Sequence, residues 1–206
     1  MTVSDTFRHA AIEWAVRGDR AASAVAAELA PKVSAVILVE GVSDAAAVET
    51  LAERSGREFE REGVCVVPMG GVTNVAKFLS ILGPTGLDVR LAGLCDVDRE
   101  RHFRRALERA GLTGAGFFVC DADLEDELIR TLGVDRLQQT LDAEGDLRAF
   151  RTFQNQPAQR SRPLDRQLRR FLGTTSGRKE RYAKILVEAL DLPRVPRPLG
   201  ELLRFL

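Results

Sequence analysis

Short runs of consecutive apolar residues alternate with longer segments in which apolar residues recur at helical spacing. A continuous run of apolar, β-branched residues is typical of a strand that is buried on both faces of a parallel sheet. Residues 36–39 are such a run, and three further apolar runs, at residues 63–67, 89–95 and 116–120, are also predicted to be strands. A helix is predicted after each of them, at residues 44–54, 73–82, 99–110 and 124–132. This alternation predicts an α/β fold, with an open parallel four-stranded sheet and helices on both faces.

The two ends of the chain lack strand patterns. Ser4 or Asp5 is expected to cap a first helix that runs to Gly18, and a second helix is expected at residues 21–30. Ser43 is expected to cap the helix that follows the first strand. Beyond Asp135 the pattern predicts helices and loops. We therefore expect an N-terminal helical segment at 1–31, the sheet domain at 32–135 and a helical C-terminal extension at 136–206.

Composition narrows the protein class. The chain has 206 residues, of which 45% are hydrophobic and 29% charged, so a disordered tail, a collagen-like fibre and a disulfide-stapled miniprotein are excluded. The longest apolar stretch, residues 33–39, is too short to cross a bilayer, and the N-terminus lacks a signal-peptide pattern. We expect a cytoplasmic protein with no membrane partner. Cys65, Cys95 and Cys120 share no metal-binding spacing and are expected to be reduced, buried thiols.

The formal net charge is zero, but the charges are separated along the chain. Residues 147–184 contain eleven Lys or Arg and two acids, so this basic segment carries +9 and the remainder −9. Such density predicts a polyanionic partner. The residues expected to bind nucleic acid are Arg162, Arg166, Arg169, Arg170, Arg178 and Arg181. In the alternative interpretation the arginines pair with the acidic remainder, and the interleaved aromatic residues are core; these are Phe150, Phe153, Phe171 and Tyr182.

Acidic residues follow three of the four predicted strands. Because sites in open α/β sheets form at the carboxyl ends of the strands, these acids are expected to gather at one edge. They are Glu40 and Asp44, then Asp96, Asp98 and Glu100, and finally Asp121, Asp123, Glu125, Asp126 and Glu127. Gathered carboxylates favour a hard divalent cation, Mg²⁺ or Mn²⁺ before Ca²⁺. Taken singly, each acid has a simpler explanation: Asp44 suits an early helical position, and Asp126 and Glu127 suit a solvated face.

The sequence Val-Glu-Gly-Val-Ser-Asp at 39–44, followed by Asp96-Val-Asp98 after a later strand, resembles the TOPRIM domain of topoisomerases, primases and several nucleases. Asp123-Leu-Glu125 and the basic helix at 177–183 extend the resemblance, over residues 35–190, to the overcoming-lysogenization-defect (OLD) nucleases. In those enzymes such acids hold two metal ions and a lysine completes the site. The resemblance aligns Lys179 with that lysine, with Arg178 as the other candidate, and aligns Asp121 one step too early to be a ligand.

The resemblance implies a metal-dependent nuclease that uses two Mg²⁺ or Mn²⁺ ions. Glu40, Asp44, Asp96 and Asp98 would hold one or both ions, and Asp123 and Glu125 would complete the second. Glu40 is alternatively a general base, and Lys179 would neutralise charge on the scissile phosphate. DNA is favoured over RNA as the substrate. Glu100 either lies in the outer part of the site or merely begins a helix.

Several alternatives stay open. The OLD enzymes carry an ATPase domain, whereas this sequence has no Gly-x-x-x-x-Gly-Lys-[Ser/Thr] loop, so we expect either a separate ATPase partner or a form without a nucleotide requirement. A homodimer is also expected from the resemblance. A nucleotidyl transferase of the same fold and a non-catalytic nucleic-acid-binding adaptor are the alternative functions.

Overall fold

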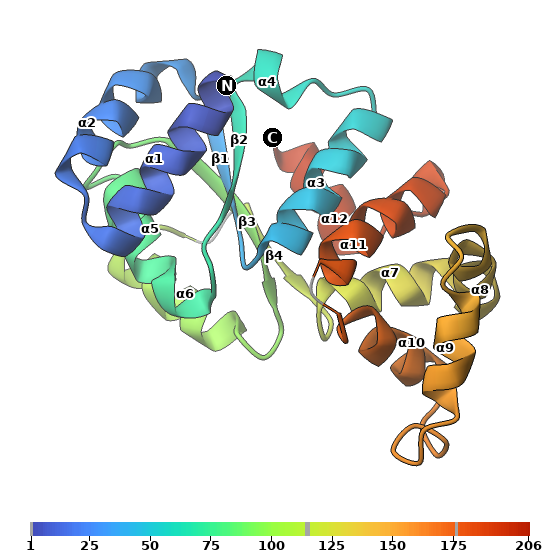
Figure 1. Cartoon of the computed structure of the whole chain (residues 1–206). Helices are drawn as coiled ribbons and strands as arrows, with labels where there is room; N and C mark the ends of the chain where they lie inside the picture. The colour runs from blue at the N-terminus through green and yellow to red at the C-terminus, as the bar shows by residue number, and fades with distance from the viewer. Residues whose placement is uncertain (1, 114–115, 176) are drawn as a thin grey trace.

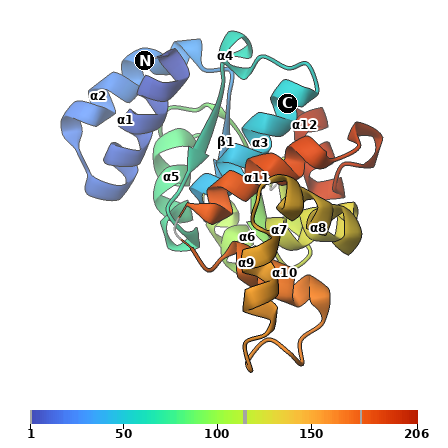
Figure 2. The same ribbon diagram turned by 45° about the vertical axis from the view of Figure 1, so that its right-hand side comes forward.

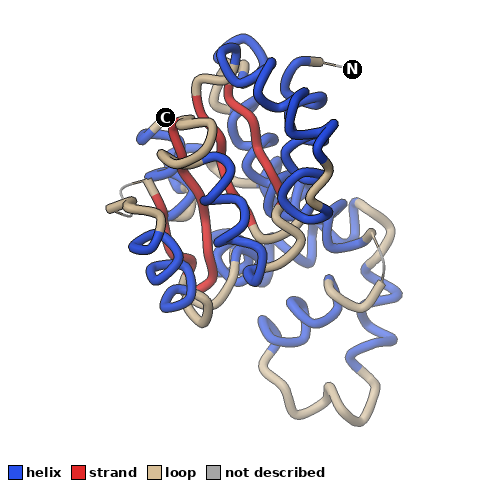
Figure 3. The backbone as a smooth tube through the Cα atoms, turned by 90° about the vertical axis from the view of Figure 1, so that its left-hand side faces the viewer, coloured by secondary structure: helices blue, strands red, loops and turns tan. Residues whose placement is uncertain are grey.

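The computed structural model of the protein describes residues 2–113, 116–175 and 177–206. Four parallel strands form one sheet in the order β2-β1-β3-β4; they are the red segments of the tube in Figure 3. The strands are β1 (Ala35–Val39), β2 (Val64–Pro68), β3 (Arg90–Asp96) and β4 (Phe117–Cys120). The expected α/β fold is confirmed, and each strand boundary lies within one residue of its prediction.

The strand order decides where the acids meet. β1 pairs with β2 on one side and with β3 on the other, so the connection leaving β1 and the connection leaving β3 diverge at this point in the sheet. Crevices at such a switch point are where open α/β sheets bind ligands. The carboxyl ends of β1 and β3, at Val39 and Asp96, are therefore neighbours.

One face of the sheet is covered by helices from the N-terminal half (Figure 1). These are α1 (Val3–Arg17), α2 (Arg20–Leu29), α5 (Val75–Leu82) and α6 (Glu100–Arg109). Val36 and Leu38 point to this face and pack in one apolar cluster with Phe7, Phe78 and Phe103. Alternate residues of β1 thus supply this core, as the period of two in a strand requires.

The opposite face is covered mainly by helices that follow β4 in the chain, together with α3 (Val42–Arg54). The later helices are α7 (Leu124–Leu132), α11 (Arg178–Ala189) and α12 (Arg197–Phe205). Ile37 and Val39 point to this side and share its apolar cluster with Leu186 of α11. The guanidinium of Arg54 also donates to the carbonyls of Val187 and Leu190, at 2.6 and 2.9 Å, which ties α3 to the end of α11.

Three further helices extend this side away from the sheet (Figure 2). They are α8 (Val134–Ala143), α9 (Leu147–Gln154) and α10 (Leu164–Leu172). α10 contacts the side of α7, so the basic segment comes close to the carboxyl edge of the sheet. The boundaries at 31/32 and 135/136 stay predictions, although helices from both outer segments share the core of the sheet.

Several helix starts differ from their predictions. Thr2 rather than Ser4 or Asp5 caps α1, and Asp5 completes the capping box with it. Gly41 rather than Ser43 is the N-cap of α3; it has no side chain to cap the helix, but its amide donates to the carboxylate of Asp44 at position N3, which is one half of a capping box. A short helix, α4 (Phe59–Glu62), was not expected.

The three cysteines are free and buried, as expected, with Cys65 and Cys95 on the side of α1 and Cys120 on the side of α3. In the parts of the chain that the structure describes, none of the helices has the length and apolar character needed to cross a membrane.

Candidate active site

The end of β1 begins the site. Glu40 and Gly41 leave the strand, and α3 starts at Val42. The amide of Gly41 donates to Oδ2 of Asp44 at 2.8 Å, which fixes the Asp44 carboxylate over the first turn of α3. The carbonyl of Glu40 accepts from the amide of Gly71 at 3.1 Å. The loop after β2 is thereby held beside the end of β1.

Three other elements complete the site. β3 ends at Asp96, α7 carries Glu125 in its first turn, and α11 carries Lys179 in its first turn. Nζ of Lys179 lies 3.0 Å from Oε1 of Glu125, whose side chain is only 9% exposed. This ion pair joins the start of α11 to the start of α7, more than fifty residues apart in the chain.

These side chains surround a cavity of about 290 Å³ at the carboxyl edge of the sheet. It is lined by Glu40, Gly41, Asp44, Gly70, Gly71, Asp96, Glu125 and Lys179. Five of the predicted site residues therefore line one cavity, as four carboxylates and one ammonium group. The excess of negative charge is the main property of this cavity.

The electrostatic cost of that excess falls on two carboxyl groups. Burial, with the charges of Asp44 and Glu40, raises the pKa of Asp96 from 3.8 to about 7. Burial and the charge of Glu125 raise the pKa of Asp44 to about 6, although the Gly41 amide and Lys179 act in the opposite direction.

Lys179 responds to the same charges. Burial would lower its pKa, but the ion pair with Glu125 and the charge of Asp44 raise it above the ordinary value. The ammonium group is therefore protonated throughout the neutral range, and it offsets only part of the negative charge.

Two predicted ligands do not line the cavity. Asp98 follows β3 in a loop, where its side chain is 64% exposed and lies 3.5 Å from Nε of Arg99. Asp123 is the N-cap of α7 and accepts from the amide of Asp126 at 2.8 Å. Its other oxygen pairs with Arg169 of α10. Asp123 thus lies beside the cavity, and its carboxylate is engaged by the Asp126 amide and by Arg169.

The donor set suits a hard divalent cation, since it offers carboxylate oxygens and a surplus of negative charge. In the described part of the chain, however, no three or more Asp, Glu, His or Cys side chains lie close enough together to hold an ion in their present rotamers. Asp44, Glu125 and Asp123 are each turned to a protein donor. The residues fit a cation by chemistry, and holding one requires side-chain rotation.

The simpler explanation for Asp126 and Glu127, that they lie on a solvated face, is wrong. Asp126 is 13% exposed and lies between Arg130 and Arg166, at 3.3 and 3.2 Å. Glu127 accepts from the amide of Asp121 at 2.8 Å and pairs with Arg130 at 2.9 Å. These acids hold the β4–α7 connection in place. Glu100 begins α6 and pairs with Arg104 along that helix.

The predicted nucleic-acid-binding arginines divide into two groups. Four of them line a separate hollow of about 560 Å³ with Gly173 and Thr174; they are Arg162, Arg166, Arg169 and Arg170. Arg178 instead lies over the ring of Phe171, 4.3 Å from its centroid. Arg181 pairs with Glu144 and Asp146 at 2.5 and 3.3 Å. Arg181 thus pairs with acids outside the basic segment, as the alternative interpretation proposed, whereas Arg178 is held by Phe171 and Thr174 and pairs with no acid among the described residues.

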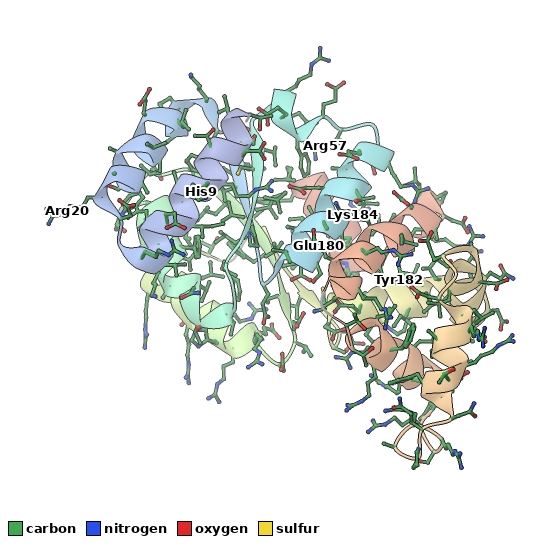
Figure 4. The ribbon with its side chains drawn as sticks, viewed as in Figure 1. His9, Arg20, Arg57, Glu180, Tyr182 and Lys184 are labelled. Atoms are coloured by element: carbon green, nitrogen blue, oxygen red, sulfur yellow. The ribbon has the colours of Figure 1, made fainter. Side chains whose placement is uncertain are left out.

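That interpretation is confirmed for the aromatic residues. Phe150, Phe153 and Phe171 are buried and pack edge to face or tilted against one another. Tyr182, labelled on α11 in Figure 4, is 1% exposed, and its hydroxyl donates to Asp146 at 2.7 Å. These rings are core residues and offer no stacking surface to bases.

Sequence reasoning missed the ion pairs between α7 and α10. Arg166 and Arg169 meet Asp126 and Asp123 across more than forty residues, and no local pattern signals such a contact. Gly70 and Gly71 both have positive φ and form part of the cavity wall. In the sequence, a pair of adjacent glycines indicates a turn and does not by itself indicate a site.

The sequence of the sheet domain was compared with known protein families. Residues 33–98 match the family model described as "Overcoming lysogenization defect protein-like, TOPRIM domain". No curated protein sequence matches the chain.

Solved structures match over most of the length. The C-terminal region of the Burkholderia pseudomallei OLD protein has a TM-score of 0.64 and 21% identity, over 84% of this chain and 96% of that one. Two structures of the C-terminal region of the Xanthomonas campestris pv. campestris OLD protein have TM-scores of 0.63 and 0.61 at 24% and 25% identity. They cover 84% of this chain and 91% and 94% of theirs.

Proposed function

We propose that this protein is a metal-dependent nuclease, because residues 33–98 match the model of the OLD-like TOPRIM domain and the chain has the fold of an OLD C-terminal region. A TOPRIM domain of this type supports a metal-dependent function on nucleic acid in general. Cleavage of phosphodiester bonds is the specific activity that we propose, with DNA as the favoured substrate.

The cavity at the end of β1 and β3 carries this proposal. It brings together the carboxylate oxygens of Glu40, Asp44, Asp96 and Glu125. Burial and mutual repulsion make the ionised forms of Asp44 and Asp96 unfavourable. A binding site that is unfavourable for its own charges gains free energy when a cation enters. A purely structural role for these acids would not explain why they share one open cavity.

We assign the residues as follows. Two bound Mg²⁺ or Mn²⁺ ions supply activation of a water molecule and stabilisation of the leaving oxygen. Asp44, Asp96 and Glu125 would hold the ions from the cavity, and Asp98 from the loop after β3 and Asp123 from the start of α7 would join them after side-chain rotation. Glu40 is either a ligand or the group that takes the proton of the attacking water. Lys179 neutralises charge on the scissile phosphate.

The test is a cleavage assay on supercoiled plasmid, linear duplex DNA and RNA, with Mg²⁺, Mn²⁺ or EDTA. We expect nicking or cutting with a divalent cation and none with EDTA. Asp96→Asn should abolish it, whereas Asp142→Asn should retain it, because Asp142 is an exposed acid of α8 outside the cavity. Salt-sensitive binding without cleavage of any substrate would contradict the nuclease and favour the adaptor.

A further inference from the structure

Two neighbouring ion pairs join α10 to the start of α7. Arg166 and Arg169 are spaced i, i+3 on α10, and Asp126 and Asp123 have the same spacing at the start of α7. Positions three apart lie on the same side of a helix, so both arginines face the same turn of α7. Arg166 and Arg169 are 48% and 38% exposed, so each guanidinium also remains open to the hollow on α10.

The hollow has more positive charge than its carboxylate partners neutralise. Arg162 and Arg170 also line it, and within the described residues neither of them forms an ion pair. Thr174 also lines the hollow, but its hydroxyl already donates to the carbonyl of Phe171 at 2.7 Å and accepts from Arg178 at 3.1 Å. A concave surface with four guanidinium groups is suited to the oxygens of a phosphate group.

Asp123 connects this hollow to the metal cavity. One of its oxygens pairs with Arg169, which lines the hollow, while its charge also acts on Asp96 and on Lys179, which line the cavity. The Asp123 side chain is 17% exposed, so it sits in a confined position between the two. Whatever engages Arg169 therefore changes how strongly Asp123 is held.

A phosphate oxygen and the Asp123 carboxylate compete for the same guanidinium. Both accept charge-assisted hydrogen bonds from arginine, and a guanidinium has a limited number of donors in a fixed geometry. When a phosphate occupies the hollow, part of the hold on Asp123 is withdrawn, and the carboxylate is freer to rotate toward a cation.

We propose that the hollow formed by Arg162, Arg166, Arg169 and Arg170 binds a backbone phosphate of the nucleic acid, and that Arg169 couples this binding to cation binding by releasing Asp123. This inference rests on the proposed function. Arg169 is a positioning residue in this arrangement, since it acts through Asp123. Because the coupling is thermodynamic, the cation must strengthen phosphate binding by the same factor.

The test measures binding rather than cleavage. Mn²⁺ is titrated calorimetrically into the full chain, with and without a saturating phosphorothioate DNA duplex that resists cleavage, and the heat of Mn²⁺ binding to the duplex alone is subtracted. We expect the duplex to raise the Mn²⁺ affinity of the wild type at least about fivefold, the lower range of typical couplings.

Two variants separate coupling from simple attraction. Arg169→Gln should raise the Mn²⁺ affinity in the absence of DNA, because Asp123 is no longer held, and should remove the effect of the duplex. Arg170→Gln is the matched control: it should weaken DNA binding but keep the coupling at saturating duplex. Circular dichroism of each variant checks that it is folded.

Three outcomes would overturn the proposal. One is a wild-type Mn²⁺ affinity that saturating duplex does not change. Another is a coupling that persists in Arg169→Gln, since the phosphate would then ligate the ion directly. The third is the full effect from sodium phosphate alone, which would identify a small phosphate as the ligand. Cleavage without coupling would defeat this inference only, and coupling without cleavage would defeat only the proposed nuclease.

Discussion

Asp96 is the residue at which the requirements of folding and of the proposed function oppose each other most directly. It ends a central strand, it is partly buried, and four neighbouring carboxylates act on it. Without a cation, the protein lowers this cost by holding a proton on Asp96 up to about pH 7. A cation bound at the proposed site would therefore displace this proton.

This predicts a pH dependence of stability in EDTA. The unfolded chain releases the Asp96 proton near pH 3.8 and the folded chain near pH 7, so the folded state binds more protons between these values. The free energy of unfolding must then fall as pH rises through this window. In thermal melts from pH 5 to pH 8, the Tm of the wild type should fall relative to that of Asp96→Asn. Parallel Tm curves would contradict the assignment.

Lys179 gives a second prediction at this scale. Lys179→Met leaves the buried carboxylate of Glu125 without its cation, and because Lys179 is half exposed we expect a loss of only about 1–2 kcal/mol in unfolding free energy. The proposed cleavage should fall by about 100-fold or more. Denaturant melts and the plasmid assay measure the two effects.

Lys184→Met is the matched control, because Lys184 is exposed on the same helix and has no ion pair among the described residues. It should leave both quantities near wild type. Equal losses in the two variants would show that the charge of α11, rather than the position of Lys179, matters.

The sequence identified the acids but not their partners. Glu40, Asp44 and Asp96 follow strands in local motifs, and local motifs are readable. The rotation of Asp123 toward Arg169 depends on how α10 packs on α7, a contact across 46 residues. Asp98 was expected in the cavity because alternation after a strand brings side chains to the same side, but β3 has already ended at Asp96, so that period no longer applies.

At the scale of elements, the start of α7 connects the cavity to α10. Its first turn supplies Glu125 to the cavity, Asp123 to Arg169 and Asp126 to Arg166. The helix itself is held from the core side by Leu124, Leu128 and Ile129, which are buried under α11 and the sheet. Periodicity predicted the bounds of this helix correctly, since apolar residues recur on one of its sides.

The aromatic core under α10 leads to a prediction about binding. Phe150→Leu should lower the free energy of unfolding by about 1–2 kcal/mol, because Phe150 is fully buried against Phe171. Its affinity for DNA should stay within twofold of wild type, as measured by fluorescence anisotropy. A loss comparable to that in Arg170→Gln would mean that the ring stacks on a base after all.

Helix starts were harder to predict than helix existence. Ser43 has the right residue type for a cap, but the N-cap is Gly41, two residues earlier, and Asp44 accepts from the Gly41 amide from inside the helix. Residue type alone does not distinguish these registers. The helix α4 is only four residues long, too short for a periodic signal.

At the scale of the whole molecule, charge separation gives a chain of zero net charge a concentrated positive segment. The basic segment forms α9 to α11, and the acids at the strand ends form the cavity on its inner side. The basic segment contains few acids of its own. Part of its positive charge is instead neutralised by acids at the start of α7 and the end of α8, where Asp123 pairs with Arg169 and Glu144 pairs with Arg181.

This leads to a prediction about salt. If the four arginines of the hollow contact DNA phosphates, the logarithm of the binding constant should fall with the logarithm of salt concentration with a slope of about −3.6. Arg162→Gln/Arg170→Gln should reduce the slope to about −1.8. Arg181→Gln should leave it unchanged, because Arg181 is paired with Glu144 and Asp146. An equal reduction in Arg181→Gln would place the DNA on α11 instead.

The distribution of the three thiols has a practical consequence. Cys65 and Cys95 lie under the N-terminal helices, and Cys120 lies under the C-terminal ones. A thiol reacts with a labelling reagent only when the layer above it opens, so the two sides of the sheet carry separate reporters. Mass spectrometry of timed labelling can therefore tell whether nucleic acid or a divalent cation tightens the layer that bears the arginines while leaving the other unchanged.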